Sequence, residues 1–427
     1  MGFAENGSIK SRLPSPESRL IEVVRERGPI TVAAFMELAL YDPQFGYYAR
    51  AARRSGRAGD FFTSVDVGPL FGELLEIQLA EMARLLEATA EIAENAEQRF
   101  LSARSAVAFF DLVEAGAGSG RLSADILRAA RQRHPPFYDA LRLHLVEASA
   151  EARAAQQESL AEVGERLTSS SDALPASFEG TLIANELLDA LPAHQVVMRD
   201  EGLREIYVDA QPQRGGRPFQ GRRMDGDANR VNGNPERVAL HLIEGPPSTP
   251  ELQAYLDRLG VTLESGWRAE INLNAVAWVR DAARRLARGF MILIDYGHDA
   301  RELYSEAHSL GTLTSYSAHR AAGADSSSAP AWLQRPGEQD ISAHVDFTSV
   351  RAAAEAEGMT TIGFLDQTYF LLGLLGDLPN PQSAIRNPQF KTLIVPGGLG
   401  STQKVLILGK GVGSPALRGL SFRVRVT

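Results

Sequence analysis

The fold is decided by one stretch of the sequence, Phe109-Phe110-Asp111-Leu112-Val113-Glu114-Ala115-Gly116-Ala117-Gly118-Ser119-Gly120-Arg121-Leu122. An apolar run is followed by three alternating glycines and then by the start of a helical pattern. Glycines at the carboxyl end of a parallel strand let a ligand approach the backbone, and the N-terminus of the next helix adds partial positive charge. The stretch therefore predicts a strand, a turn and a helix that bind a nucleotide-like cofactor.

The spacing of these glycines distinguishes between cofactors. A dinucleotide fingerprint has the spacing G-x-G-x-x-G, whereas this chain has Gly116-x-Gly118-x-Gly120 and carries Arg121 where the third glycine would be. The sequence also contains no G-x-x-x-x-G-K-[ST] run, which excludes a phosphate-binding P-loop. The pattern makes an NAD-dependent dehydrogenase the weaker interpretation.

The segments after this stretch alternate between strand and helix patterns. Strands are predicted at 106–114, 141–147, 180–184, 290–295, 359–364 and 405–408, and helices at 121–134, 150–163 and 274–287. Such alternation is typical of a parallel sheet that helices cover on both faces. The predicted fold class is α/β, with a doubly wound, Rossmann-like sheet.

The second predicted strand ends in an acid, Glu147. A carboxylate at this position can accept two hydrogen bonds from ribose hydroxyls, so Glu147 is the expected ribose ligand. The alternative is that Glu147 only caps the helix that begins near Ser149. Its place one βαβ unit after the glycine turn favours the ribose role.

An N-terminal arm is predicted over residues 1–68, with helices at 16–27 and 30–40. A long helix follows at 70–100, where apolar residues recur every three or four positions. A break in this helix is expected near Thr89.

The sheet domain is predicted to occupy residues 69–199 and 266–427, the second part with a substrate-side α+β insertion near 300–347. Residues 200–265 form an inserted β-rich segment. Within it, Asp209–Arg237 is rich in Gly, Arg, Asn and Pro and lacks periodicity, which predicts a mobile loop.

Composition limits the partners and the location. The 44 Lys and Arg against 53 Asp and Glu give a net charge of −9, so the chain lacks the basic surplus of a nucleic-acid binder. It has no cysteine, which excludes thiolate zinc and iron–sulfur sites, and the sequence predicts no metal site. No stretch reaches the ~18–20 apolar residues of a membrane span, and the residues up to Pro29 lack a leader pattern. A cytoplasmic protein is expected.

Six short blocks accompany the glycine turn. They are Tyr41–Tyr48, Gly59–Ser64, Phe71–Glu73, Ala184–Gln195, Ile294–His298 and Gly337–Phe347. In this order they resemble the pattern of the MidA-like methyltransferases, a family that includes a mitochondrial complex I assembly factor that methylates an arginine. The resemblance extends from about Ile30 to Gly411.

This resemblance implies a class I methyltransferase fold, S-adenosylmethionine as methyl donor, and an arginine of a partner protein, such as a respiratory-complex subunit, as acceptor. It also implies that the Gly59–Ser64 block offers hydroxyl and amide donors to the cofactor. The expected cofactor ligands are then Gly59, Thr63, Ser64, Gly116, Ala117, Gly118, Glu147 and Asn185.

The chain departs from the family pattern at two places. Gly116–Gly120 stands where the family usually has Gly-Pro-Gly-Arg-Gly, which keeps the glycines needed for close approach. Ser64-Val65-Asp66 replaces Ser-Pro-Glu. This second departure, together with the unusual Asp209–Arg237 segment, leaves the acceptor open.

Methyl transfer from a sulfonium is an in-line displacement, so the protein has to hold the nucleophile at ~3–3.5 Å from the methyl carbon and exclude water. An arginine acceptor arrives charged, and carboxylates must orient it. Glu186 and Asp189 follow the strand at 180–184 and are the expected clamp for such a cation, with Asn185 placed to hold the cofactor or the acceptor. The alternative makes these acids partners of a helix dipole.

Two histidines are candidates to take the proton that methylation releases. His298 follows the strand that ends in Asp295, and His344 precedes Asp346, which is close enough in sequence to orient it. A lone histidine is more often structural, as we expect for His194 and for His319.

Three functions remain open from the sequence. The first is an arginine methyltransferase that acts on a partner protein, and the second is an O- or N-methyltransferase of a small molecule. The third is a non-catalytic assembly factor that keeps the fold. Binding of S-adenosylmethionine and the chemical nature of the labelled product separate them.

Overall fold

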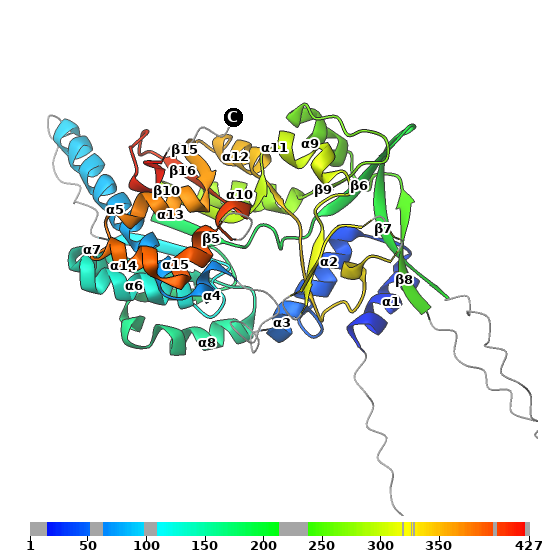
Figure 1. Ribbon diagram of the computed structural model, residues 1–427, viewed down its shortest axis with the longest axis horizontal. Helices are drawn as coiled ribbons and strands as arrows, with labels where there is room; N and C mark the ends of the chain where they lie inside the picture. Colours follow the sequence, from blue (N-terminus) through cyan, green and yellow to red (C-terminus); the bar gives the residue numbers. More distant parts are fainter. Residues whose placement is uncertain are drawn as a thin grey trace, which may run out of the picture.

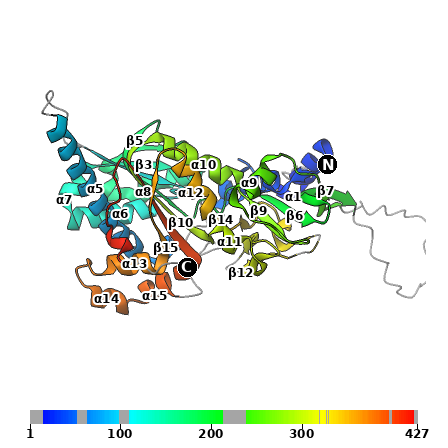
Figure 2. The same cartoon turned by 90° about the horizontal axis from the view of Figure 1, so that it is seen from above.

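The computed structural model describes residues 15–51, 63–97, 109–212, 238–317, 320–325, 327, 329–395 and 399–422. The chain forms two lobes that lie side by side, a larger one around the glycine turn and a smaller one that contains the first helices (Figure 1). A view from above shows that β10 and β14 extend from the larger lobe toward the smaller one (Figure 2).

The larger lobe is built on a sheet with the strand order β15-β16-β10-β5-β2-β3-β4. The strands are β2 (Phe110–Ala115), β3 (Leu141–Val146), β4 (Leu167–Ser171), β5 (Phe178–Asn185), β10 (Leu286–His298), β15 (Thr360–Asp366) and β16 (Gln403–Lys410). β4, β3, β2, β5 and β10 are parallel to one another, and β16 runs antiparallel to both β10 and β15. This arrangement confirms the predicted doubly wound α/β class.

Alternation of side chains along the strands explains why both faces of the sheet are covered. On β10, Phe290 and Ile292 belong to the apolar core on one face, whereas Met291 and Leu293 belong to the core on the other. All four are fully buried. A strand that is buried on both faces is a nearly continuous apolar run, as the sequence of β10 is.

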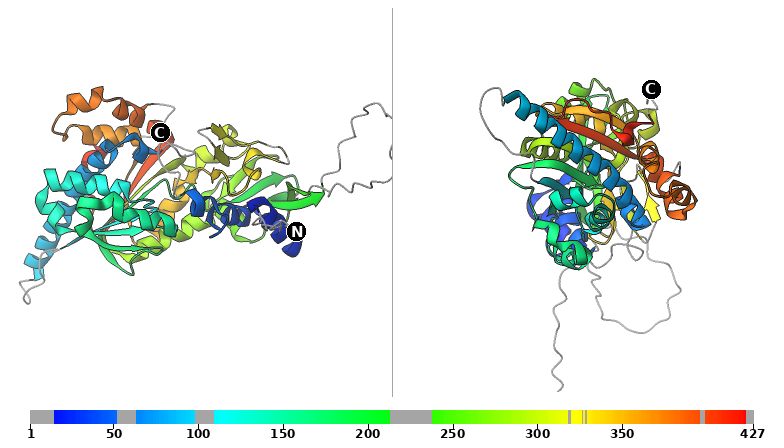
Figure 3. Two further views of the ribbon diagram at one scale, coloured as in Figure 1. Left: turned by 90° about the horizontal axis from the view of Figure 1, so that it is seen from below. Right: turned by 90° about the vertical axis from the view of Figure 1, so that its left-hand side faces the viewer.

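Helices form the layers on the two faces. The first layer contains α5 (Leu70–Glu97), α6 (Arg121–Arg133), α7 (Pro135–Ala140), α13 (Gln367–Leu375), α14 (Pro381–Arg386) and α15 (Pro388–Ile394). The second contains α10 (Leu273–Arg285) and α12 (Phe347–Glu355). The predicted break near Thr89 is absent, since α5 runs to Glu97, and Figure 3 shows this long blue helix across the sheet.

The smaller lobe contains a second sheet, with the order β1-β7-β6-β9 and with β8 on the other side of β7. Its strands are β1 (Ile30–Thr31), β6 (His194–Arg199), β7 (Gly202–Pro212), β8 (Val238–Gly245) and β9 (Arg268–Ile271). α1 (Pro16–Arg27), α2 (Val32–Tyr41) and α9 (Glu251–Leu259) pack on it.

The predicted domain boundaries, at 199/200 and 265/266, do not match the way in which the strands pair. β6 and β9 were both assigned to the sheet domain, but they pair with each other and belong to the second sheet. The physical reason is that β6 follows the turn after β5 and is directed away from the first sheet. Residues 213–237 of the predicted mobile loop lie outside the described residues.

Short elements complete the chain. They are α3 (Tyr47–Ala51), α4 (Ser64–Val67), α8 (Ala150–Leu160), η1 (Ala161–Arg166), α11 (Ala300–Leu303), η2 (Glu306–His308), β11 (Thr314–Ser317), β12 (Arg320–Ala322), η3 (Ala331–Leu333), β13 (Asp340–Ser342), β14 (Val345–Asp346), α16 (Leu399–Thr402) and η4 (Arg418–Leu420). β12, β11 and β13 form a third small sheet within the predicted insertion. In the described part of the chain, no helix is both long enough and apolar enough to cross a membrane.

Candidate active site

The glycine turn lies at the carboxyl end of β2, where it joins α6. Gly116, Gly118 and Gly120 all have positive φ, at +70°, +51° and +79°. A Cβ on Gly116 would come within 3.2 Å of Leu187, whereas a Cβ on Gly118 would meet no atom within 4 Å. Gly118 therefore faces open space, so a bound ligand can come close to its backbone.

Glu147 is joined directly to this turn. Its Oε2 accepts a hydrogen bond from the Gly118 N–H at 2.8 Å, and its Oε1 accepts one from the Ser149 N–H at 2.8 Å. The side chain of Ser149, not that of Glu147, caps α8, because its Oγ accepts from the Ala152 N–H. Each carboxylate oxygen of Glu147 keeps a further lone pair that can accept from a hydroxyl.

A cavity of about 390 Å³ lies over these residues, a volume within the usual range for small-molecule sites. Seven of the predicted site residues line it, namely Thr63, Gly116, Ala117, Gly118, Glu147, Asn185 and Glu186. Gly59 lies outside the described residues. The cavity is thus at the carboxyl edge of the sheet, where doubly wound folds bind their ligands.

The charged residues that line the cavity are mostly acidic. Among the described residues they are the acids Asp66, Glu114, Glu147, Asp172 and Glu186 and one base, Arg121. Arg121 is paired, because its guanidinium lies 3.0 Å from Asp66 and also donates to the Val65 carbonyl. The cavity is therefore suited to a ligand that carries positive charge.

Thr63 and Ser64 take different positions around α4. Thr63 caps this short helix and lines the cavity. Ser64 is fully buried and does not line it. Its N–H donates to Glu186 Oε1 at 3.1 Å, and its hydroxyl donates to Gln403 Oε1 at 2.9 Å. The predicted cofactor contact of Ser64 is therefore not what the structure shows, since Ser64 instead positions Glu186.

Glu186 has an unusual backbone for an acid, with φ at +51°. A non-glycine residue in this region is strained and is held there by its surroundings, here by the N–H of Glu186 itself, which donates to the Ile294 carbonyl at 2.8 Å. Burial raises the pKa of Glu186 to about 7, although the bond from Ser64 opposes this shift. The side chain can therefore gain or lose a proton near neutral pH.

Asn185 precedes Glu186 and also lines the cavity. Its side-chain Nδ2 donates to Glu186 Oε1 at 3.5 Å. Its Oδ1 is buried and finds no hydrogen-bond partner among the described residues. Because an unpartnered buried acceptor is costly, this oxygen is a place where a ligand donor would be stabilised.

Asp189 is buried and does not line the cavity, whereas Glu186 does, so the two acids do not form the predicted clamp on the cavity wall. Asp189 lies beside Asp295, which ends the apolar part of β10 and accepts from the N–H groups of Leu188 at 2.7 Å and Tyr296 at 2.9 Å. Burial and the nearby Asp295 raise the pKa of Asp189 well above its usual value. Since the backbone donors favour the charged form of Asp295, Asp189 is the neutral member of the pair.

Tyrosines of the N-terminal arm form one wall of the cavity. Tyr41, Tyr47 and Tyr48 all line it, with ring centroids 5.3 Å apart for Tyr41 with Tyr48 and for Tyr47 with Tyr48. Tyr41 donates to the Ala190 carbonyl at 3.1 Å, and Tyr48 donates to Asp340 at 2.8 Å. The arm is thereby bound to the turn that follows β5.

The histidines do not occupy the predicted catalytic position. Neither His298 nor His344 lines the cavity, and their rings instead stack near His308. Burial lowers the pKa of His344 to about 4, which makes it a poor base at neutral pH. Asp346 does not orient His344, because it caps α12 and accepts from Tyr255.

Of the two histidines expected to be structural, His194 and His319, the structure describes one. His194 lies 2.7 Å from the buried Glu205, which is a structural role as expected. His319 lies outside the described residues.

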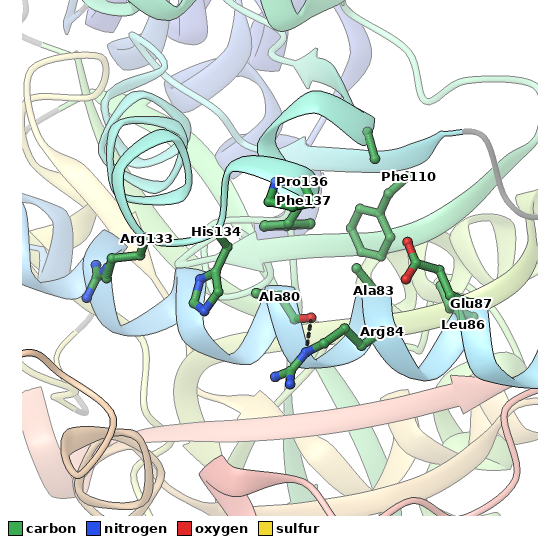
Figure 4. Close-up of a pocket in the computed structure, with 11 residues that line it drawn as sticks. Ala80, Ala83, Arg84, Leu86, Glu87, Phe110, Arg133, His134, Pro136 and Phe137 are labelled. Carbon is green, nitrogen blue, oxygen red and sulfur yellow. Dashed lines mark hydrogen bonds between the residues drawn. The ribbon is translucent and has the colours of Figure 1, made fainter.

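A second, smaller cavity of about 210 Å³ lies elsewhere, between α5 and α7 (Figure 4). Phe110, Pro136 and Phe137 give it an apolar lining, and Arg84 on its rim donates to the Ala80 carbonyl. None of the predicted site residues that the structure describes lines it.

Several residues of the larger cavity were missed by sequence reasoning. Asp172 follows β4, whose sequence Leu-Thr-Ser-Ser-Ser carries no apolar strand signal. Trp278 lies on α10, and nothing in its helical periodicity distinguishes it from a packing residue. Tyr41 begins a block that the family resemblance includes, which was the available signal for it.

Comparison with known proteins agrees with this geometry. The sequence profile of a family of S-adenosyl-L-methionine-dependent methyltransferases matches residues 91–365. The mouse (Mus musculus) protein arginine methyltransferase NDUFAF7, mitochondrial, is 27% identical over 391 residues, which are 86% of this chain and 76% of that protein. Its Drosophila melanogaster homologue is 26% identical over 447 residues, with 96% and 89% covered.

A solved structure is also similar over nearly the whole chain. A protein from Burkholderia thailandensis that was crystallised with S-adenosyl-homocysteine is 28% identical to this chain, and the two structures superpose with a TM-score of 0.74. The similarity covers 95% of this chain and 94% of that one.

The names of the relatives contradict the expected location. A cytoplasmic protein was expected, whereas the relatives from mouse, rat and human are named mitochondrial. The expectation was wrong because it rested on the lack of a leader pattern up to Pro29, which does not decide where a protein is located.

The matched region contains the glycine turn, Glu147 and the segment from Asn185 to Asp189. These are the residues that form or adjoin the cavity at the carboxyl edge of the sheet. The chain belongs to this family of S-adenosyl-L-methionine-dependent methyltransferases.

Proposed function

We propose that the chain transfers a methyl group from S-adenosylmethionine to an arginine guanidinium of a partner protein. The observation that carries this proposal is the Glu186 carboxylate. Among the described residues of the cavity wall it is accompanied by four other acids and a paired arginine. The relatives named as protein arginine methyltransferases support the choice of acceptor.

The residues of the cavity fit this cofactor. Gly118 offers bare backbone and open space, and Glu147 offers two oxygens with free lone pairs for the ribose hydroxyls. The unpartnered Oδ1 of Asn185 is an acceptor suited to the ammonium group of the amino-acid part. When bound, the cofactor supplies a methyl group on a positively charged sulfur.

The acceptor would enter beside Glu186 and the tyrosine wall. A guanidinium is charged at all relevant pH values and needs a carboxylate partner when it leaves water. Glu186 can provide that partner, and the faces of Tyr41 and Tyr48 can pack against a flat cation. Both tyrosines also help to exclude water, which keeps the reacting atoms in place.

The reaction releases one proton. A methyl group replaces a hydrogen on one guanidinium nitrogen, and the guanidinium is positively charged both before and after the transfer. A carboxylate with a pKa near 7 can accept this proton and pass it to solvent. Glu186 is therefore the proposed base, in place of the two histidines.

The test is methylation of protein substrates from a mitochondrial extract with methyl-labelled cofactor, followed by mass spectrometry of the labelled peptides. We expect label on arginine, and a loss of at least about 100-fold in rate for Glu186→Gln, with binding of S-adenosylhomocysteine preserved. The matched control is Glu179→Gln, which changes an acid at the opposite end of β5 that pairs with Arg288.

Two outcomes would reject the proposal. Label found only in small molecules would identify the chain as a metabolite methyltransferase. A rate of the Glu186 variant equal to that of the Glu179 control would remove Glu186 from the reaction.

A further inference from the structure

Three histidines from distant parts of the sequence meet beside the end of β10. His298 is the last residue of β10, His308 is the last residue of η2, and His344 immediately precedes β14. The pairing of β14 with β10, which aligns His298 with Asp346, brings His344 to this point. One nitrogen from each ring lies within 4.8 Å of the other two.

Two of the buried ring nitrogens lack a hydrogen-bond partner in the part of the chain that the structure describes. The Nδ1 atoms of His298 and His344 are buried and have no hydrogen-bond partner among the described residues. His308 Nδ1 lies 3.0 Å from the carbonyl of Glu302, which can only accept, so this nitrogen carries the hydrogen. The Nε2 of His308 is therefore left with a free lone pair.

A carboxylate lies at the edge of the cluster. Glu302 Oε1 is 3.1 Å from His298 Nδ1, but the two groups lack the alignment of a hydrogen bond. Its side chain is 57% exposed, so it can rotate toward the three rings without opening the core. A fourth ligand is thus available next to three imidazoles.

The spacing is close to that of a metal centre. Three points within 4.8 Å of one another always have a common point no more than about 2.8 Å from each, and zinc–nitrogen bonds are ~2.0–2.1 Å long. Each ring would have to move by less than about 1 Å to reach such a bond. Rotation of the side chains supplies movements of this size.

We propose that His298, His308 and His344 bind a divalent transition-metal ion, with Zn²⁺ as the best match and Glu302 or water as the fourth ligand. Imidazole nitrogens favour Zn²⁺ and its neighbours over Ca²⁺ and Mg²⁺, which prefer oxygen. A set of three histidines with one further position is an established zinc geometry. No metal site was expected from the sequence, because the chain has no cysteine and these histidines are far apart along it.

The site has a structural consequence for the cavity, although its ligands do not line it. The residue before His344, Ala343, donates its N–H to the Asp189 carbonyl at 2.9 Å. The ion would join η2 and the start of β14 to the end of β10. It would thereby fix the insertion next to the turn that carries Glu186.

The test is titration of tag-free full-length protein, first stripped with a chelator, with Zn²⁺ by calorimetry and with Co²⁺ by visible spectroscopy. We expect one equivalent of Zn²⁺, and intense Co²⁺ absorption bands of a four-coordinate site. His308→Ala and His344→Ala should each weaken Zn²⁺ binding by at least about 100-fold.

The matched control is His241→Ala on β8, whose ring lies 3.7 Å from Asp209 and away from the cluster. This variant should bind both ions like the parent protein. Circular dichroism and binding of S-adenosylhomocysteine show whether each variant is folded. Absence of saturable binding by the folded parent, or equal binding by the His308 variant and the control, would overturn the proposal.

Discussion

Replacement of Glu147 by glutamine is expected to weaken the binding of S-adenosylhomocysteine by roughly 10- to 100-fold. The two oxygens of Glu147 already accept from Gly118 and Ser149, and each keeps a lone pair for one ribose hydroxyl. Glutamine has one oxygen and one NH₂ group, and the NH₂ group cannot accept from a backbone N–H. One charge-assisted bond of about 1.5–3 kcal/mol is therefore lost on the ligand side.

The assay is calorimetric titration of S-adenosylhomocysteine into the parent protein and two variants. The control is Glu151→Gln, an exposed acid in the first turn of α8, which should bind like the parent. A melting temperature measured for each protein shows whether the fold survives. Binding by the Glu147 variant within twofold of the parent would refute the role of this side chain.

Further outcomes follow from the same geometry. Gly118→Ala should weaken cofactor binding at least tenfold, because it adds a methyl group to the open side of a turn with positive φ. The control is Gly358→Ala, which also changes a glycine with positive φ in open space and should bind the cofactor normally in the same titration. The rate of methyl transfer should rise with pH and level off above an inflection near 7, because the pKa of Glu186 is raised to about 7 and its ionised form accepts the proton. A pH-rate profile without that inflection would show that Glu186 is not the base. Asp295→Ala should lower the free energy of unfolding by about 3 kcal/mol or more, because the buried N–H groups of Leu188 and Asp189 lose their acceptor. The exposed Asp281→Ala should change it little, and equal denaturation midpoints for the two variants would contradict this.

Local sequence patterns predicted the strands of the larger sheet except β4, which has no apolar run. The helix predicted at 121–134 is observed as Arg121–Arg133, and the strand predicted at 141–147 is observed as Leu141–Val146. Both have strong periodicity and clear ends. The smaller sheet was placed poorly, because pairing between β6 and β9 joins segments about 70 residues apart and leaves no local signal.

The residues at the strand ends were predictable for a simple reason. Parallel strands end at one edge of a sheet, so Gly118, Glu147 and Asn185 had to lie near one another once the fold was known. The direction of the side chains was not predictable in the same way. Asp189 does not line the cavity, and its turn is held by Asp295, which accepts from the N–H groups of Leu188 and Asp189. These contacts join residues more than 100 positions apart.

The histidine cluster could not be predicted from local sequence patterns either. His298, His308 and His344 do not follow the spacing of a local metal-binding motif, since 10 and 36 positions separate them. The pairing of β10 with β14 brings His344 beside His298, and it involves only two residues on each strand. No local pattern predicts such a short bridge.

A crystal structure of this chain with S-adenosylhomocysteine would show directly whether the cofactor binds at the carboxyl edge of the larger sheet. We expect the adenosyl group to lie in the larger cavity, with both ribose hydroxyls on Glu147 and the rest of the ligand over the backbone at Gly118. A ligand bound instead between α5 and α7, or a cavity from which Glu147 points away, would contradict this expectation.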